Sequence, residues 1–338
     1  MNDKPKSNFG FDLDEILETN QGRNFKRIQP NDIRKDLDYY FEHGKPMGEP
    51  CGIDVLNSNF RWRRKGGLYV ISGYEQSGKS EFCKYLAVLR AKLYKTKTVI
   101  FSPEEETEDI TEDLCRSYLR KNVNPLFDRR ATPDEWNRAR DFINDHFLLL
   151  EFDGMADFRL LTDEYSALAE EGYKMFVTDP WNYVAEGSLD QGGIFFLKTA
   201  LSHMKTFSRR YGVHKLIVEH QNNKLDHKGN LIPASKNNIQ GGAMWKNKPD
   251  CIIIIHSHWT EETEDTSVSI EIAKSKQQRY NGQKGTKTLY FELETGTYHG
   301  DEPDKQFQIN LNPQTDEGNK PLYPEYRKDA EPEEDQPF

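Results

Sequence analysis

From residue 67 onward, short apolar runs alternate along the chain with segments of helical periodicity. The runs have strand length, and the segments between them repeat apolar residues every three or four positions. The runs lie at 68–71, 98–102, 147–150, 174–179, 215–220, 251–255, 268–272 and 288–293. The helical segments lie at 81–93, 133–146, 158–171 and 196–211. This alternation predicts an α/β fold with a central, mostly parallel twisted sheet flanked by helices.

The two ends of the chain lack this pattern. Residues 1–32 are polar and mixed in charge and predict a flexible N-terminal arm, and residues 33–66 predict a lead-in linker with one short helix before Gly44. The α/β domain is expected at 67–299. Residues 300–338 combine prolines and acidic residues with little apolar pattern, which is typical of an acidic, disordered tail.

The segment between the first strand and the first helix has the form G-x-x-x-x-G-K-[ST], from Gly73 to Ser80. Its glycines allow a tight turn whose backbone N–H groups converge on phosphates, Lys79 reaches the β- and γ-phosphates, and the Ser80 hydroxyl ligates Mg²⁺. A strand before the loop and a helix after it are the setting that this motif requires. ATP and Mg²⁺ are therefore the expected cofactors. We assign nucleotide binding to Gly73, Gln76, Ser77, Gly78, Lys79, Ser80 and Glu81.

Polar residues at the carboxyl ends of further strands are candidates for the chemistry, because ligands of open α/β sheets bind at that edge. Asp179 ends an apolar run and is placed to hold Mg²⁺ together with Ser80. Glu104 fits a general base for attack of water on a γ-phosphate, and it also fits an acidic residue that complements a helix dipole. His220 fits either a γ-phosphate contact or a histidine with structural partners only. Both interpretations stay open for Glu104 and for His220.

Composition narrows the class of protein. The 338 residues include 46 Lys and Arg against 56 Asp and Glu, a net charge of −10. This net charge argues against a protein that coats nucleic acid by bulk electrostatics, but it is compatible with a local basic channel. The basic segment 61–65 fits either a nucleic-acid contact or a solvated turn. No apolar run can span a bilayer and the start has no signal-like region, so we expect a cytoplasmic protein without membrane association. Four scattered cysteines predict buried free thiols.

The order of these signals resembles the RecA-like helicase domain of the DnaB, Twinkle and phage replicative helicases. The likeness runs from about residue 33 to 298 and rests on many ordered matches. They are Gly44-Lys45-Pro46-Met47-Gly48, Ser77-Gly78-Lys79-Ser80-Glu81-Phe82, Phe101-Ser102-Pro103-Glu104, Asp179-Pro180-Trp181-Asn182, Val218-Glu219-His220, the segment 241–250 and Arg279-Tyr280-Asn281-Gly282. The resemblance implies a RecA-like P-loop NTPase at 67–299, in a bacterial cell or a phage-infected host. It also implies a ring, usually a hexamer, that hydrolyses ATP and moves 5′ to 3′ along single-stranded DNA.

The resemblance further implies a role for each matched residue. Glu104 matches the glutamate that activates water, Asp179 the Mg²⁺-associated aspartate and His220 the γ-phosphate sensor. Arg279 matches an arginine finger that each subunit supplies to its neighbour's ATP, which is why the likeness implies an oligomer. The loops 185–193 and 221–240 match those that line the pore and grip the phosphates of single-stranded DNA.

The chain departs from this family pattern at three positions. Gln277 stands where relatives often carry a basic residue, Gln221 stands where proline commonly follows the sensor, and Glu219 is an unusual acid beside the sensor. No primase-like region precedes the domain, so priming is expected to come from another protein.

The acidic end of the chain, which closes with Pro337-Phe338, resembles the tips of bacterial single-stranded-DNA-binding proteins and of some phage helicases. It fits docking of a replication partner, and it also fits a solubilising tail. Two rival functions stay open beside the helicase: a DNA-binding RecA-like ATPase that does not unwind, and an ATP-regulated replication scaffold that acts through its tail. Strand displacement separates the first rival from a helicase, and stimulation of ATP hydrolysis by DNA separates the second.

Overall fold

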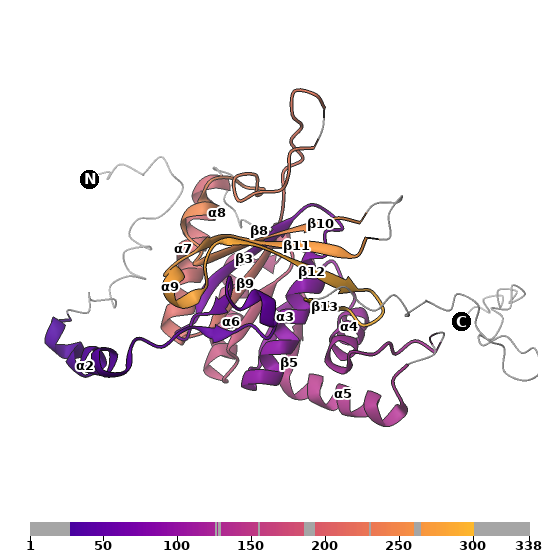
Figure 1. The fold of residues 1–338 in the computed structure, drawn as a ribbon, viewed down its shortest axis with the longest axis horizontal. Helices are drawn as coiled ribbons and strands as arrows, with labels where there is room; N and C mark the ends of the chain where they lie inside the picture. Colours follow the sequence, from indigo (N-terminus) through magenta and orange to yellow (C-terminus); the bar gives the residue numbers. More distant parts are fainter. Residues whose placement is uncertain are drawn as a thin grey trace, which may run out of the picture.

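A computed structural model describes residues 28–125, 127, 130–154, 156–185, 193–229, 231–259 and 265–300. Within these residues the chain folds around a nine-stranded sheet (Figure 1). In spatial order its strands are β13 (Thr297–His299), β12 (Gly285–Glu292), β11 (Ser267–Ser275), β10 (Cys251–Ser257), β3 (Gly67–Gly73), β9 (His214–His220), β7 (Met175–Thr178), β4 (Thr98–Phe101) and β5 (Phe147–Leu150). From β10 to β5 neighbouring strands run parallel, whereas β11, β12 and β13 are antiparallel additions at one edge. The predicted mostly parallel α/β sheet is confirmed.

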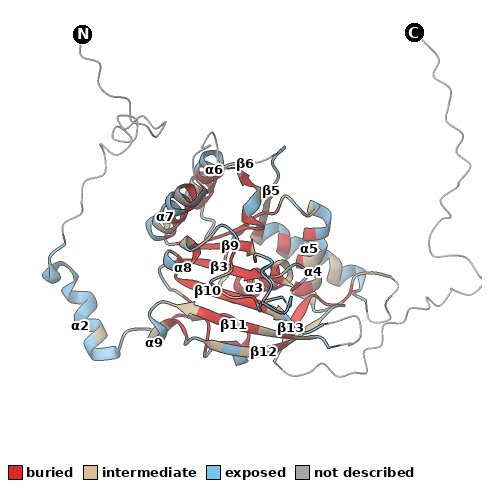
Figure 2. Ribbon diagram, turned by 90° about the horizontal axis from the view of Figure 1, so that it is seen from above, coloured by how far each residue is buried: buried red, intermediate tan, exposed pale blue. Residues whose placement is uncertain are grey.

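Helices cover both faces of this sheet. One face carries α3 (Lys79–Tyr94), α4 (Thr107–Leu119) and α5 (Pro133–His146), and the other carries α6 (Phe158–Glu170), α7 (Gly193–Tyr211) and α8 (Met244–Asn247). Side chains of β3 alternate between the layers: Tyr69 and Ile71 pack with α3, and Leu68 and Val70 pack with α6 and α7. All seven residues of β3 are buried, as Figure 2 shows for the central strands generally. The strand that leads into the phosphate loop is thus held from both sides.

Short elements complete the described chain. They are η1 (Pro30–Ile33), α2 (Arg34–His43), β1 (Glu49–Pro50), η2 (Asp54–Leu56), β2 (Arg61–Trp62), β6 (Ala156–Asp157), η3 (Trp181–Tyr183), β8 (Val184–Ala185) and α9 (Gln278–Asn281). The lead-in helix α2 buries no residue and lies away from the body of the domain (Figure 2). In contrast, Cys51, Leu56 and Trp62 are fully buried in the layer of α3. The packed core therefore begins upstream of residue 67.

The hydrophobic pattern located the predicted strands and helices, but it missed α4, and β11 and β12 extend beyond the predicted runs. β12 begins at Gly285 rather than at 288, because alternate residues of its first half are exposed and leave no apolar run. The four cysteines are buried free thiols, as expected. In the part of the chain that the structure describes, no helix is long and apolar enough to cross a membrane.

Several expected segments lie outside the described residues: the arm before residue 28, most of the loop 185–193, and the tail from residue 301, which includes Pro337 and Phe338. The loop 221–240 is described except at residue 230, and it projects from the domain (Figure 1). Its described part forms no strand, and it is crossed by isolated bridges between Gln221 and Ile239 and between Leu225 and Leu231 and by several hydrogen bonds. The basic segment 61–65 makes internal contacts: Arg63 pairs with Asp250 at 2.6 Å, and Arg64 donates to the Met47 carbonyl at 2.7 Å.

Candidate nucleotide-binding site

The phosphate loop links the end of β3 to the start of α3. The backbone turns through left-handed conformations at Gln76 (φ 57°) and Gly78 (φ 82°) before α3 begins at Lys79. A Cβ atom at Gly73 would lie 2.4 Å from the Ser77 Oγ and 2.6 Å from the Ile255 carbonyl oxygen. Only glycine fits where the loop folds back on the strand, so this position of the motif has a steric cause.

Lys79 extends over its own loop. Its Nζ donates to the carbonyl oxygen of Tyr74 at 2.7 Å, and the residue is only 6% exposed. Burial lowers the pKa of Lys79, and the charges of Asp179, Glu75, Glu104 and Glu219 act against that decrease. The Ser77 hydroxyl lies buried in the same loop with no hydrogen-bond partner among the described atoms. An anion in the loop would give the Ser77 hydroxyl the partner that it lacks and would offer Lys79 an alternative to the Tyr74 carbonyl, which fits a nucleotide phosphate.

Ser80 and Asp179 meet beside the loop, as the motif requires for Mg²⁺. Their side chains are close enough for the Ser80 hydroxyl to lower the pKa of Asp179, which is 6% exposed just after the end of β7. Burial raises the pKa of Asp179 to about 7, against the effect of the Ser80 hydroxyl. Among the described residues no group of three or more His, Cys, Asp or Glu is arranged to hold a metal. One hydroxyl and one carboxylate fit Mg²⁺ all the same, since this ion keeps waters and takes its other ligands from phosphates.

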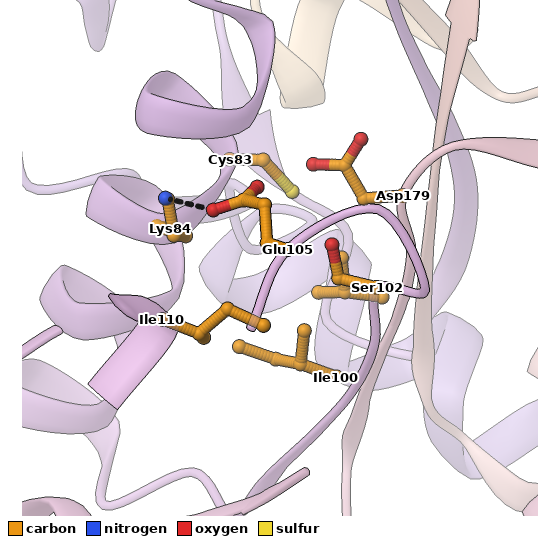
Figure 3. A pocket seen from close by; sticks show the side chains of 8 residues that line it. Cys83, Lys84, Ile100, Ser102, Glu105, Ile110 and Asp179 are labelled. Atoms are coloured by element: carbon orange, nitrogen blue, oxygen red, sulfur yellow. Dashed lines mark hydrogen bonds and ion pairs between the residues drawn. The ribbon is translucent and has the colours of Figure 1, made fainter. Parts of the chain in front are cut away.

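Two neighbouring glutamates after β4 differ in their surroundings. Glu104 is exposed and close enough to Lys79 to influence its pKa. Glu105 instead accepts a hydrogen bond from Lys84 Nζ at 2.7 Å and faces the same small cavity as Asp179 (Figure 3). The two carboxylates are therefore not interchangeable, because only Glu104 is free of an ion pair among the described residues.

Lys84, on α3, connects three segments, among them the one that carries Glu104 and Glu105. Besides Glu105, its Nζ contacts Glu81 at 2.9 Å and Asp113 on α4, and the residue is 5% exposed. Burial alone would lower the pKa of Lys84, but the three carboxylates outweigh burial and raise it. The lysine thus stays charged and ties α3 and α4 to the segment that carries Glu104. Sequence analysis missed this role, because only Glu81, three residues away, is a local signal. Glu81 itself, which we assigned to nucleotide binding, forms this ion pair.

His220 ends β9 directly beside the phosphate loop, since its backbone is in register with Gly73. Its ring is half-buried, burial lowers its pKa, and its Nδ1 has no partner among the described atoms. Glu219 is 3% exposed and accepts the backbone N–H of His220 at 2.8 Å. Burial raises the pKa of Glu219 to about 8. A neutral histidine with one open nitrogen, next to Lys79, can contact a γ-phosphate.

The loop 221–240 is attached to the same edge of the sheet. Gln221 donates to the Ser72 Oγ at 2.8 Å and accepts from the backbone of Ser235 at 3.0 Å. The Tyr74 hydroxyl, inside the phosphate loop, donates to the carbonyl of Ile232. The projecting loop is therefore in direct contact with the phosphate loop and with the end of β3.

Arg279 lies at the opposite end of the strands, beside the start of β3 and not beside its carboxyl end. It follows β11, whose last residue Ser275 pairs with Cys251, and Cys251 in turn pairs with Tyr69 near the start of β3. The length of β3 therefore separates Arg279 from Gly73, roughly 15–20 Å at the usual rise per residue. The side chain is exposed and stacks on Tyr280. The structure brings Lys79, Ser80, Glu104, Asp179 and His220 together and keeps Arg279 apart from them.

The chain resembles known proteins in sequence and in fold. No protein-family model matches the chain. The chain is 26% identical over 281 residues to the Twinkle homolog protein, chloroplastic/mitochondrial, of Arabidopsis thaliana. This alignment covers 79% of the chain and 39% of the relative, so the chain matches well under half of the relative's length.

Two solved structures share the fold. One, described as an ATPase domain, matches with a TM-score of 0.65 at 14% identity, over 81% of this chain and 100% of that one. A DnaB-like replicative helicase, described with its interactions with primase, matches with a TM-score of 0.63 at 13% identity, over 85% of this chain and 70% of that one. The chain therefore has the RecA-like fold of these ATPase domains, and its sequence is similar to that of a Twinkle homolog.

Proposed function

We propose that this chain is an ATP-dependent replicative DNA helicase that forms a ring and moves along single-stranded DNA. The observation that carries the proposal is the convergence of Asp179, Glu104 and His220 on Lys79 at the edge of the sheet where β3 enters the phosphate loop. The likeness to Twinkle and to a DnaB-like replicative helicase supports the choice of DNA unwinding among the reactions of P-loop proteins.

In ATP hydrolysis each residue at the carboxyl ends of these strands has a separate role. Glu104, exposed and without an ion pair among the described residues, accepts the proton of the attacking water. Lys79 leaves the Tyr74 carbonyl to contact the phosphates, and the open Nδ1 of His220 contacts the γ-phosphate. Ser80 and Asp179 would hold Mg²⁺, whose charge would offset that of the phosphate oxygens.

The position of Arg279 supports a shared site. An exposed arginine at the opposite end of the strands cannot reach the phosphate loop of its own chain without unfolding the strands between them. It can instead reach the nucleotide of a neighbouring subunit, and repetition of that contact closes a ring, which we take to be a hexamer.

The loop 221–240 supplies the DNA contact in this proposal. It carries Lys224, Lys228 and Lys236, and its ties to Ser72 and Tyr74 couple it to the nucleotide. Backbone phosphates bind such lysines without regard to sequence, as movement along a strand requires. We take the direction to be 5′ to 3′, as the resemblance to replicative helicases implies.

The test is steady-state ATP hydrolysis with and without a single-stranded oligonucleotide, at two salt concentrations, with Lys79→Ala as the control. We expect stimulation that weakens with salt and disappears in the variant, followed by displacement of one strand from a forked duplex. ATP hydrolysis that does not respond to DNA would reject the motor in favour of a scaffold. Stimulated hydrolysis without strand displacement would leave a DNA-dependent ATPase that does not unwind.

A further inference from the structure

The last described strand contacts the phosphate loop through one side chain. Tyr298 of β13 donates its hydroxyl to the carbonyl oxygen of Gly78 at 3.0 Å, although the two residues are 220 positions apart. Tyr298 is 3% exposed. From this contact we infer that Tyr298 is a positioning residue, which orients the Gly78–Lys79 peptide for phosphate binding. The inference rests on the proposed function, because it requires a nucleotide in the loop.

The geometry of the peptide bond explains how a contact to the Gly78 carbonyl can orient the Lys79 N–H. The carbonyl of Gly78 and the N–H of Lys79 belong to one planar trans peptide, so they point in opposite directions. The carbonyl accepts both the Tyr298 hydroxyl and the N–H of Phe82, the latter at 2.9 Å. With the carbonyl held on that side, the N–H of Lys79 points into the loop, where a first-turn helix N–H serves a phosphate.

A residue other than glycine would not fit at position 78. Its φ of 82° is left-handed, and a Cβ atom would lie 2.8 Å from the Tyr298 hydroxyl. The glycine lets the tyrosine approach the backbone, and the tyrosine in turn stabilises the conformation that glycine permits.

The tyrosine is fixed independently of the loop. Its ring packs on Phe82, Tyr85 and Phe291, with centroid distances of 5.2, 5.8 and 4.9 Å. The turn before β13 is tied to α4 by the Ser117 hydroxyl, which donates to the Gly296 carbonyl at 3.0 Å. The hydroxyl therefore acts on the loop from a rigid support, which is the requirement for a positioning residue.

Tyr298→Phe removes the hydroxyl and keeps the ring. We expect the Kd for a fluorescent ADP analogue with Mg²⁺ to rise about fivefold, which corresponds to one hydrogen bond of about 1 kcal/mol. The KM for ATP should rise similarly, with kcat at saturating ATP unchanged, because the residue touches no reacting atom. Tyr290→Phe, on the neighbouring strand β12, removes a tyrosine hydroxyl that makes no hydrogen bond to the described residues and should leave both constants unchanged.

Phe291→Leu separates positioning from packing. It loosens the ring cluster around Tyr298 without removing the hydroxyl, so it should lower the melting temperature but change the Kd less than twofold. An unchanged Kd in Tyr298→Phe would overturn the inference, as would an equal rise of the Kd in Phe291→Leu. Failure of the wild-type protein to bind the analogue would instead reject the proposed function, and the inference with it.

Discussion

The replacement of Asp179 by Asn should stabilise the nucleotide-free protein while it abolishes hydrolysis. Burial raises the pKa of Asp179 from its ordinary value of 3.8 to about 7, so ionisation of this carboxyl opposes folding. A carboxyl whose pKa is raised by folding stabilises the folded state most when it is protonated, and that contribution declines as the pH rises from 3.8 through about 7. Asparagine has the same shape without the charge. The stability advantage of Asp179→Asn should therefore grow between pH 4 and 7 and stay constant above pH 8.

The magnitude follows from the difference between the two pKa values. About three pH units correspond to roughly 4 kcal/mol as an upper limit, and local relaxation and water entry reduce the expected gain at pH 8 to about 2 kcal/mol. Hydrolysis is lost because a neutral amide does not replace the carboxylate at Mg²⁺.

Asp250→Asn is the matched control, since the same chemical change should have the opposite sign. Burial alone would raise the pKa of Asp250, but the hydrogen bond from Lys205 and the charge of Arg63 outweigh it and lower the pKa. Asn at this position leaves Arg63 and Lys205 without the carboxylate that they contact at 2.6 and 2.9 Å. We expect a loss of about 2–4 kcal/mol at pH 8.

The assay is urea unfolding of each nucleotide-free variant at pH 5 and pH 8, followed by circular dichroism. The electrostatic argument is refuted if Asp179→Asn is less stable than the wild-type protein at pH 8, or if both variants shift the free energy of unfolding in the same direction.

Three further predictions concern the remaining residues of the site. Glu104→Gln should abolish ATP hydrolysis but spare nucleotide binding, measured by turnover and by equilibrium titration, and near-normal turnover would contradict its role as the base. Arg279→Ala should be inactive alone and regain some turnover when mixed with Lys79→Ala subunits, whereas a mixture without activity would count against a finger supplied in trans. Lys84→Met should lower the melting temperature by several degrees and reduce kcat at least tenfold with little change in KM, because Glu105 loses the contact that holds the Glu104 segment; an unchanged kcat would show that this contact does not position Glu104.

The sequence was informative wherever the structure is locally determined. Apolar runs and helical spacing predicted the parallel strands and most helices, because burial on both faces leaves a continuous apolar signal. The phosphate loop could be recognised because its glycines, lysine and serine perform their tasks within eight residues of each other. The start of α5 also depends on local chemistry, because Thr132 caps this helix by accepting the N–H of Glu135 at 3.3 Å.

The tertiary structure decided the contacts between distant segments. Sequence left the role of His220 open, and the structure places it in register with Gly73. No local pattern distinguished Glu104 from Glu105, since their difference arises from Lys84, which is 21 residues from Glu105. The same holds for Tyr298 and Gly78, 220 residues apart. Local structure follows from the periodicity and chemistry of neighbouring residues. A contact between distant segments depends instead on the order of the strands in the sheet, which no short segment of the chain determines.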